Sequence, residues 1–289
     1  MGTLYLVATP IGNLEDITLR ALRVLREARL IAAEDTRHTR ILLDHYQITT
    51  PCISYHEHNK LVRRDEILAA LQAGDVALVS DAGTPAIADP GQELVQACLA
   101  AGHMVVPIPG PSAPLAALVV SGMDTSRFAF LGFLPRQPRE RRDLLHEIAD
   151  LTITVICFET PHRLLDTLHD IDVVLGPRQL AIANDLTKRF EAVLRGTAHE
   201  LIEYFTQHAP RGEFTLVIAG AKPTSERKRD RHRLRAQTNS VSPETIVACL
   251  RRLHDQGLSG STAVRRAAQE LGVPKNTVYD IWHDLFGRS

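Results

Sequence analysis

Short apolar strands alternate with helices along the first half of this 289-residue chain, and this alternation constrains the fold more than any other feature. Residues 3–8, 30–33, 75–80 and 104–108 have the length and apolar character of buried strands. Helical segments with an apolar stripe or small residues separate them. A strand, a helix and then another strand is the pattern of a largely parallel sheet covered by helices. The sequence therefore predicts an α/β fold.

The second half repeats the pattern after a boundary at Gly122-Met123-Asp124. Further strands are predicted at 128–131, 153–158, 180–183 and 214–219. A basic, polar run follows that cannot bury enough apolar surface to fold alone. Three short helices, separated by glycine and proline, end the chain. The expected organisation is an N-terminal α/β domain (1–122), a second α/β domain (123–221), a basic linker (222–240) and a helical C-terminal module (241–289).

Overall charge and cysteine content say little about partners. The formal net charge is −1 and the charged fraction is 23%, so charge has to be interpreted locally. The four cysteines are far apart and form no CxxC pair, which argues against a disulfide or zinc framework. The N-terminus has no signal-peptide pattern, and no apolar run is long enough to cross a membrane. We therefore expect a cytoplasmic protein.

Three loops rich in glycine and proline follow three of the predicted strands: residues 9–13 (TPIGN), 81–85 (DAGTP) and 109–113 (PGPSA). Ligands of open α/β sheets bind beyond the carboxyl ends of the strands, and glycine allows the backbone to approach them closely. A single loop of this kind could be an ordinary turn, but three together favour a ligand site. None matches a dinucleotide or P-loop motif, so a phosphate-binding loop is not predicted.

Two polar clusters are candidates for chemistry. Glu34, Asp35, Arg37 and His38 follow the strand 30–33. Asp35 could simply cap a helix, or the cluster could be catalytic or orient a substrate. The second cluster, His56-Glu57-His58-Asn59, precedes another helix. Two histidines need at least one more ligand to hold a metal ion, and the only other candidates are Cys52 and His38. No metal is therefore predicted, and a polar loop or an RNA contact is favoured.

Further cations could meet phosphate. Lys188 and Arg189 follow a predicted strand, in a segment that could equally be a solvated turn. Arg139, Arg141 and Arg142 lie near a helix start, where they could form either a salt-bridged helix face or a phosphate-contacting patch.

The motifs together resemble one family. In order along residues 3 to about 220, the chain resembles the ribosomal RNA methyltransferases of the tetrapyrrole methylase superfamily. The motifs that carry the resemblance are TPIGNLEDIT (9–18), AEDTRHT (33–39), HEHN (56–59), VSDAGTP (79–85), DPG (89–91), PGPSA (109–113) and FETPHR (158–163). Several multi-residue motifs in the expected order make a specific signal.

The resemblance implies two α/β domains with S-adenosylmethionine in the cleft between them, and a homodimer. It implies methylation of the ribose 2′-hydroxyl of cytidine 1402 in 16S ribosomal RNA of the small subunit. The positions expected to touch the cofactor are Ile11, Asp81, Ala82, Gly83, Thr84, Ser112, Ala113, Phe158, Ala183 and Phe214.

Methyl transfer needs the ribose oxygen aligned with the methyl group and a base that takes the proton. The groups in the motifs that could orient the hydroxyl, relay its proton or hold RNA are Glu34, Asp35, Arg37, His38, His56, His58, Asn59 and Lys188. The sequence does not choose among them. At one place the chain departs from the family pattern, because Asn184-Asp185 stands where Arg-Glu is usual before Leu-Thr-Lys.

Two alternatives stay open. The same fold could methylate a tetrapyrrole, an acidic macrocycle, although the EDTRHT and HEHN strings favour RNA. The C-terminal helices could instead form a helix-turn-helix of a nucleic-acid-binding regulator, which would have no need of a cofactor cleft.

Overall fold

The computed structural model describes residues 2–222, 242–256, 258, 260–271, 273 and 275–286. The chain forms two compact units, residues 1–221 and 222–289. Residues 223–240 of the predicted basic linker lie outside the described residues.

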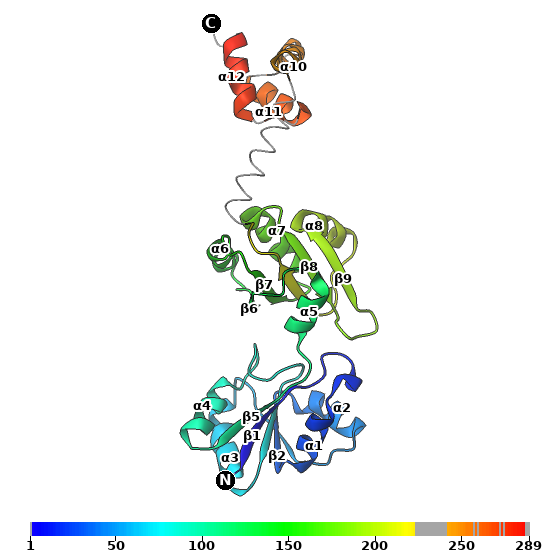
Figure 1. Ribbon diagram of the computed structural model, residues 1–289, viewed down its shortest axis with the longest axis vertical. Helices are drawn as coiled ribbons and strands as arrows, with labels where there is room; N and C mark the ends of the chain where they lie inside the picture. The colour runs from blue at the N-terminus through cyan, green and yellow to red at the C-terminus, as the bar shows by residue number, and fades with distance from the viewer. Residues whose placement is uncertain are drawn as a thin grey trace. The chain divides into compact units, whose positions relative to one another are not determined.

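The first sheet is parallel throughout (Figure 1). Its strand order is β3-β2-β4-β1-β5. All four residues of β4 are buried, which is typical of a parallel strand covered by helices on both faces. Because the strands are parallel, their carboxyl ends meet at one edge of the sheet, and the loops that follow them gather there. The strands are β1 (Thr3–Val7), β2 (Leu30–Ala33), β3 (Cys52–Ser54), β4 (Val76–Val79) and β5 (Met104–Ile108).

Two pairs of helices cover this sheet. Helices α1 (Leu19–Glu27) and α2 (Thr36–His45) share one core cluster with the sheet. Helices α3 (Lys60–Ala73) and α4 (Gln92–Ala100) share another, whose strand residues point to the opposite face. Thr18 caps α1 by accepting a hydrogen bond from the backbone N–H of Ala21 at 3.0 Å.

The second sheet is mixed. Its order is β6-β7-β10-β8-β9, in which β6 and β7 are parallel and the other neighbours are antiparallel. Strand β9 at the sheet edge was not predicted from the sequence. The strands are β6 (Phe128–Phe133), β7 (Thr154–Glu159), β8 (Gln179–Asn184), β9 (Ala192–Thr197) and β10 (Phe214–Ile218).

Helices also cover both faces of the second sheet. Helices α6 (Pro138–Glu147), α7 (Leu164–Leu175) and α8 (Ala198–Gln207) pack on one face. Helix α5 (Ala113–Ser121) packs on the other, where Ala117 and Leu118 meet Ile156 and Val217. Helix α5 precedes the boundary expected at residue 122, and division of this unit into two domains stays a prediction. The α/β fold with two sheets is confirmed.

The described residues of the second unit form three helices, as the sequence predicted: α10 (Pro243–Asp255), α11 (Gly260–Leu271) and α12 (Lys275–Phe286). They share a core of their own, which includes Leu250, Val264 and Val278. Within the described ranges, no helix of the protein is long and apolar enough to cross a membrane.

Candidate functional site

Hydrogen bonds join the three loops that follow β1, β4 and β5. Thr9 and Gly83 exchange two backbone hydrogen bonds, with N···O distances of 2.9 and 3.0 Å. The Thr84 hydroxyl donates to the backbone oxygen of Pro111 at 3.4 Å. Gly83 has φ +82°, a backbone conformation that residues with a side chain rarely adopt, so a glycine fits this contact between loops. The loops that the sequence singled out therefore lie together.

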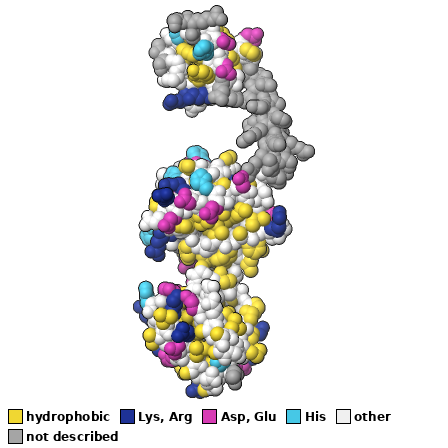
Figure 2. Space-filling view, turned by 90° about the vertical axis from the view of Figure 1, so that its left-hand side faces the viewer, with side chains coloured by type: hydrophobic (Ala, Val, Ile, Leu, Met, Phe, Trp, Pro, Cys, Tyr) yellow, Lys and Arg dark blue, Asp and Glu magenta, His cyan; other side chains and the backbone are white. Residues whose placement is uncertain are grey.

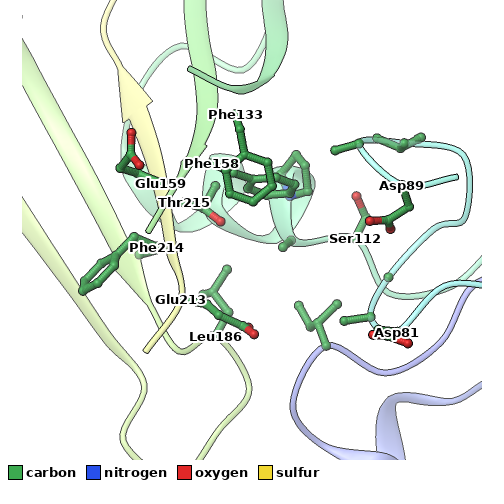
Figure 3. Close-up of a pocket in the computed structure, with 18 of the residues that line it drawn as sticks. Asp81, Asp89, Ser112, Phe133, Phe158, Glu159, Leu186, Glu213, Phe214 and Thr215 are labelled. Atoms are coloured by element: carbon green, nitrogen blue, oxygen red, sulfur yellow. The ribbon is translucent and has the colours of Figure 1, made fainter. Parts of the chain in front are cut away.

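A cavity of about 370 Å³ lies against these loops and against residues of the second sheet (Figure 3). All ten positions predicted to touch a cofactor line it. Of the eight predicted catalytic positions, Glu34 lines it and the other seven do not. The lining residues that the sequence analysis did not propose are Ile87, Ala88, Asp89, Pro114, Phe133, Glu159, Thr160, Pro161, Leu186, Gly212, Glu213 and Thr215.

The cavity combines aromatic and acidic side chains. The rings of Phe133 and Phe158 lie with centroids 5.3 Å apart. Five carboxylate residues, and no lysine, arginine or histidine, are among the lining residues: Glu34, Asp81, Asp89, Glu159 and Glu213. This combination suits a ligand that has an apolar or aromatic part and a positive charge, and it is unfavourable for an anion.

Three of these carboxylates interact at the end of the first sheet. Burial and then the charge of Asp81 raise the pKa of Glu34. Burial, followed by the charges of Glu34 and Asp81, raises the pKa of Asp89 to about 7, against the opposing effect of a hydrogen bond from Ser80. The Asp81 carboxylate accepts the backbone N–H of Asp35 at 3.0 Å. Asp89 therefore changes protonation near neutral pH.

This arrangement predicts that Asp89→Asn stabilises the protein above neutral pH. Asp89 has a pKa of about 7 in the folded protein and 3.8 ordinarily, so the folded state holds the proton more tightly. Its contribution to stability therefore falls as pH rises from about 4 to about 7. After discounting for partial exposure, we expect the asparagine variant to gain about 1–2 kcal/mol at pH 8 and almost nothing at pH 4.

Thermal unfolding of both proteins at the two pH values measures this difference. Asp143→Asn, at an exposed carboxylate on α6, is the matched control and should leave the pH dependence unchanged. Equal melting temperatures of wild type and Asp89→Asn at pH 8 would contradict the prediction.

Asp35 and Arg37 form an ion pair at the start of α2. The carboxylate of Asp35 caps the helix by accepting the backbone N–H of Arg37 at 2.8 Å. It also accepts from the Arg37 guanidinium at 3.1 and 2.7 Å, which holds the pKa of Asp35 well below its usual range. The capping role considered from the sequence is therefore present. The Arg37 side chain is still 89% exposed and open to a partner.

In the second polar cluster, the side chain of Asn59 forms hydrogen bonds to the backbone on the N-terminal side of α3. Its side-chain oxygen accepts the backbone N–H of His56 at 2.8 Å, and its amide donates to the backbone oxygen of Ser54 at 3.2 Å. Asn59 thus fixes the turn between β3 and α3, and His58 is exposed on that turn. In the part of the chain that is described, no three or more His, Cys, Asp or Glu side chains are arranged to hold a metal ion.

Lys188 lies beside the cavity and not among its lining residues. Its ammonium pairs with Asp185 at 2.9 Å and with the cavity residue Glu213 at 3.0 Å. Asn184 donates to the backbone oxygen of Arg211 at 2.9 Å. The Asn184-Asp185 pair that departs from the family pattern therefore makes specific contacts to the segment 211–213.

Residues 3–202 match the family of tetrapyrrole (corrin/porphyrin) methylases, which defines the class of this fold and cavity. A solved uroporphyrin-III C-methyltransferase from Thermus thermophilus, complexed with S-adenosyl homocysteine, has the same fold: the TM-score is 0.55 at 20% identity, over 75% of this chain and 97% of that one.

Two curated relatives specify the branch, and both are named ribosomal RNA small subunit methyltransferase I. The one from Synechocystis sp. is 51% identical over 287 residues, 99% of either chain. The one from Thermotoga maritima is 48% identical over 221 residues, 76% of this chain and 99% of that protein. The chain belongs to the ribosomal RNA small subunit methyltransferase I family of tetrapyrrole methylases, which confirms the family predicted from the motifs.

Proposed function

We propose that this protein transfers a methyl group from S-adenosylmethionine to the 2′-hydroxyl of cytidine 1402 in 16S ribosomal RNA of the small subunit. One observation carries the proposal: all ten positions expected to touch the cofactor line one cavity, in a chain that matches a relative of this name over 99% of its length. A cytoplasmic location follows from a ribosomal substrate.

The residues of the cavity fit S-adenosylmethionine. The ligand has an aromatic base and a positively charged sulfonium, and the cavity offers phenylalanine rings and carboxylates. The backbone at Gly83 lies close to Ile11 and Pro111: a Cβ atom added to Gly83 would lie 3.5 Å from Ile11 Cγ2 and 3.8 Å from Pro111 O. When bound, S-adenosylmethionine supplies an electrophilic methyl group. The protein's residues bind it, exclude water and orient the acceptor hydroxyl.

The charge of the cavity argues against the tetrapyrrole alternative. An acidic macrocycle needs cations at its carboxylates, whereas the lining residues include acids and no lysine, arginine or histidine. A ribose hydroxyl is neutral at the reacting atom. RNA phosphates can be held outside the cavity by exposed arginine and lysine side chains.

A relative of the same name argues against the regulator alternative. The Thermotoga maritima protein is matched over 99% of its length by only 76% of this chain, so about a quarter of this chain has no counterpart in a relative of the same name. The described residues from 242 onward hold five acidic and five basic side chains, so this part of the unit shows no excess of positive charge for binding RNA. We propose that this unit, with the basic run 222–235, is accessory and strengthens RNA binding.

The predicted substrate-side positions outside the cavity lining are proposed to contact RNA or orient the ribose: Asp35, Arg37, His38, His56, His58, Asn59 and Lys188. For Arg37 the expected role is a phosphate contact, because its guanidinium is exposed and fixed at one end by Asp35. Arg37→Ala is expected to weaken binding of small subunits and to reduce the salt slope of binding by about 1 while kcat holds.

Binding measured at several salt concentrations tests the role of Arg37. Arg23→Ala is the matched control, because Arg23 is an exposed arginine on α1 that pairs with Glu27. An Arg37 variant with the salt slope of wild type would remove this side chain from the RNA surface.

A second copy of the chain is proposed to cover an apolar surface on the second sheet and α5. Figure 2 shows hydrophobic side chains gathered on the part of the chain that contains the second sheet. Exposed strand edges and apolar patches of this kind favour association. The exposed side chains on α5 and β6 are Leu115, Val119, Val120, Phe128 and Phe133. Sedimentation velocity should report a dimer, and a monomer at micromolar concentration contradicts this assembly.

The decisive experiment for the function is transfer of a labelled methyl group to small ribosomal subunits that lack the modification, followed by mapping of the labelled nucleotide. The expected product is a 2′-O-methyl group at cytidine 1402. Labelling of another nucleotide overturns the target, and transfer to a tetrapyrrole precursor with none to RNA overturns the substrate class.

A further inference from the structure

The loop between β4 and α4 is built to hold Asp89 in one position. Ala86 and Ala88 both have positive φ, of 67° and 63°. Such backbone strain in non-glycine residues persists only where the surroundings enforce it, and it is concentrated at functional sites. Gly91 allows the loop to pack closely, because a Cβ there lies 3.0 Å from both the Ala86 Cβ and the Leu78 Cδ2. The strained loop carries Ile87, Ala88 and Asp89 into the lining of the cavity.

The surroundings of Asp89 favour a carboxylate that can take up a proton. Figure 3 shows its side chain directed into the cavity. The charged groups that act on it are Glu34 after β2 and Asp81 after β4, and Ser80 provides a hydrogen bond. Burial and two neighbouring negative charges oppose ionisation, which leaves the group with a pKa of about 7. A general base is most effective when its pKa lies near the working pH.

The other acids of the cavity are engaged elsewhere. Glu159 accepts hydrogen bonds from Thr160 N–H and from the Thr167 hydroxyl, both at 2.8 Å. Glu213 pairs with Lys188. Asp81 accepts the Asp35 N–H, which fixes one of its oxygens. Glu34 shares the site with Asp89 and acts on its charge, which is the arrangement of a positioning residue.

We propose that Asp89 is the catalytic base that accepts the proton of the acceptor hydroxyl, with Glu34, which lines the same cavity, as its positioning residue. This inference rests on the proposed methyl transfer. In the step, the O–H bond breaks and its proton goes to a carboxylate oxygen of Asp89. The oxygen forms a bond to the methyl carbon, and the electron pair of the broken carbon–sulfur bond stays on the donor sulfur.

The test is the pH dependence of methyl transfer to small ribosomal subunits by the full chain. Wild-type turnover is expected to rise with pH through about 7 and then level off, because Asp89 must be ionised to accept a proton. Asp89→Asn is expected to lose turnover by about 100-fold or more and to lack this rise, while calorimetry gives S-adenosylmethionine affinity within about threefold of wild type.

Glu34→Gln gives a readout that a merely structural role does not produce. Removing the negative charge of Glu34 lowers the pKa of Asp89, so the rise in turnover should move to lower pH. Glu93→Gln is the control, because Glu93 is an exposed carboxylate on α4 that pairs with Lys60 outside the site. It should keep the wild-type profile.

The outcomes separate this inference from the proposed function. A wild type that methylates no ribosomal RNA overturns both. A wild type that methylates cytidine 1402, together with an Asp89→Asn variant that keeps its rate and pH profile, overturns the role of Asp89 alone. An Asp89→Asn variant that loses cofactor affinity by the same factor as turnover makes Asp89 a cofactor ligand and overturns its role as base. The wild-type and Glu34→Gln profiles decide the question even if Asp89→Asn fails to fold.

Discussion

Replacement of Asp170 by alanine is expected to lower the free energy of unfolding by about 3–5 kcal/mol, because it leaves a buried guanidinium without its partner. Asp170 on α7 accepts hydrogen bonds from Arg141 on α6, with distances of 2.7 Å to Nε and 2.6 Å to the terminal nitrogen. The Arg141 side chain is 4% exposed. This ion pair joins the two helices over the core of the second sheet.

Urea unfolding of matched variants tests the cost of breaking this pair. Arg142 also meets Asp170, at 3.3 Å, but its side chain is 47% exposed, so Arg142→Ala should cost about 1 kcal/mol or less. A loss below about 1 kcal/mol for Asp170→Ala would show that water reaches the Arg141 guanidinium after the change.

The same pair resolves an alternative that the sequence left open. Arg139, Arg141 and Arg142 could have formed a salt-bridged face or a phosphate patch; Arg141 and Arg142 pair with Asp170 on α7, and the choice stays open for Arg139. Their partner is 28–29 residues away in the chain, so no local pattern could have identified it.

The first sheet and the gathering of its loops could be predicted because both follow from local patterns. An apolar run of four to six residues followed by a helix indicates a buried parallel strand, and parallel strands bring their carboxyl ends to one edge. The glycine- and proline-rich loops after β1, β4 and β5 were therefore expected at the same edge, and the strand order β4-β1-β5 makes them neighbours. The contact between Thr9 and Gly83 is the expected result.

Only part of the other wall of the cavity could be predicted: the family resemblance supplied Phe158, Ala183 and Phe214 and missed the residues around them. Leu186, Gly212, Glu213 and Thr215 come from antiparallel β8 and β10 and the segments beside them. The register that brings these residues to the cavity depends on long-range pairing. Asp89 belongs to the DPG motif that the sequence analysis noted. Its burial and the negative charges beside it arise only in the folded chain, so the sequence could not predict its raised pKa.

The polar motifs were harder to interpret because side chains can serve structure and function together. Asp35 and Asn59 hold local turns through hydrogen bonds to nearby backbone groups. Such bonds are invisible in a motif, since the same residue types are also typical of catalytic loops. These contacts account for the positions of Asp35 and Asn59 and leave their proposed roles toward RNA to experiment.

Gly12→Ala is expected to weaken S-adenosylmethionine binding by about one to two powers of ten. A Cβ at Gly12 lies 2.5 Å from Lys188 Cγ and 2.9 Å from both Leu186 O and Thr187 Oγ1, distances that real Cβ contacts do not show. Thr187 already has φ +64°, so the opposing segment is constrained. To remove this clash, the segment that contains Ile11 has to move away from the segment that contains Leu186, and both residues line the cavity. Overpacking of this kind costs about 1–3 kcal/mol.

Calorimetry with S-adenosylmethionine measures the effect, and two further variants isolate its cause. Gly102→Ala introduces a side chain at φ +79° with no atom within 4 Å, so it adds strain without a clash and should bind normally. Adding Lys188→Ala to Gly12→Ala removes the nearest clashing atom and leaves the contacts to Leu186 and Thr187, so affinity should recover in part. If Gly12→Ala alone binds like wild type, the segments at 9–13 and 186–188 can part without opening the cavity, and their contact does not shape the cofactor site.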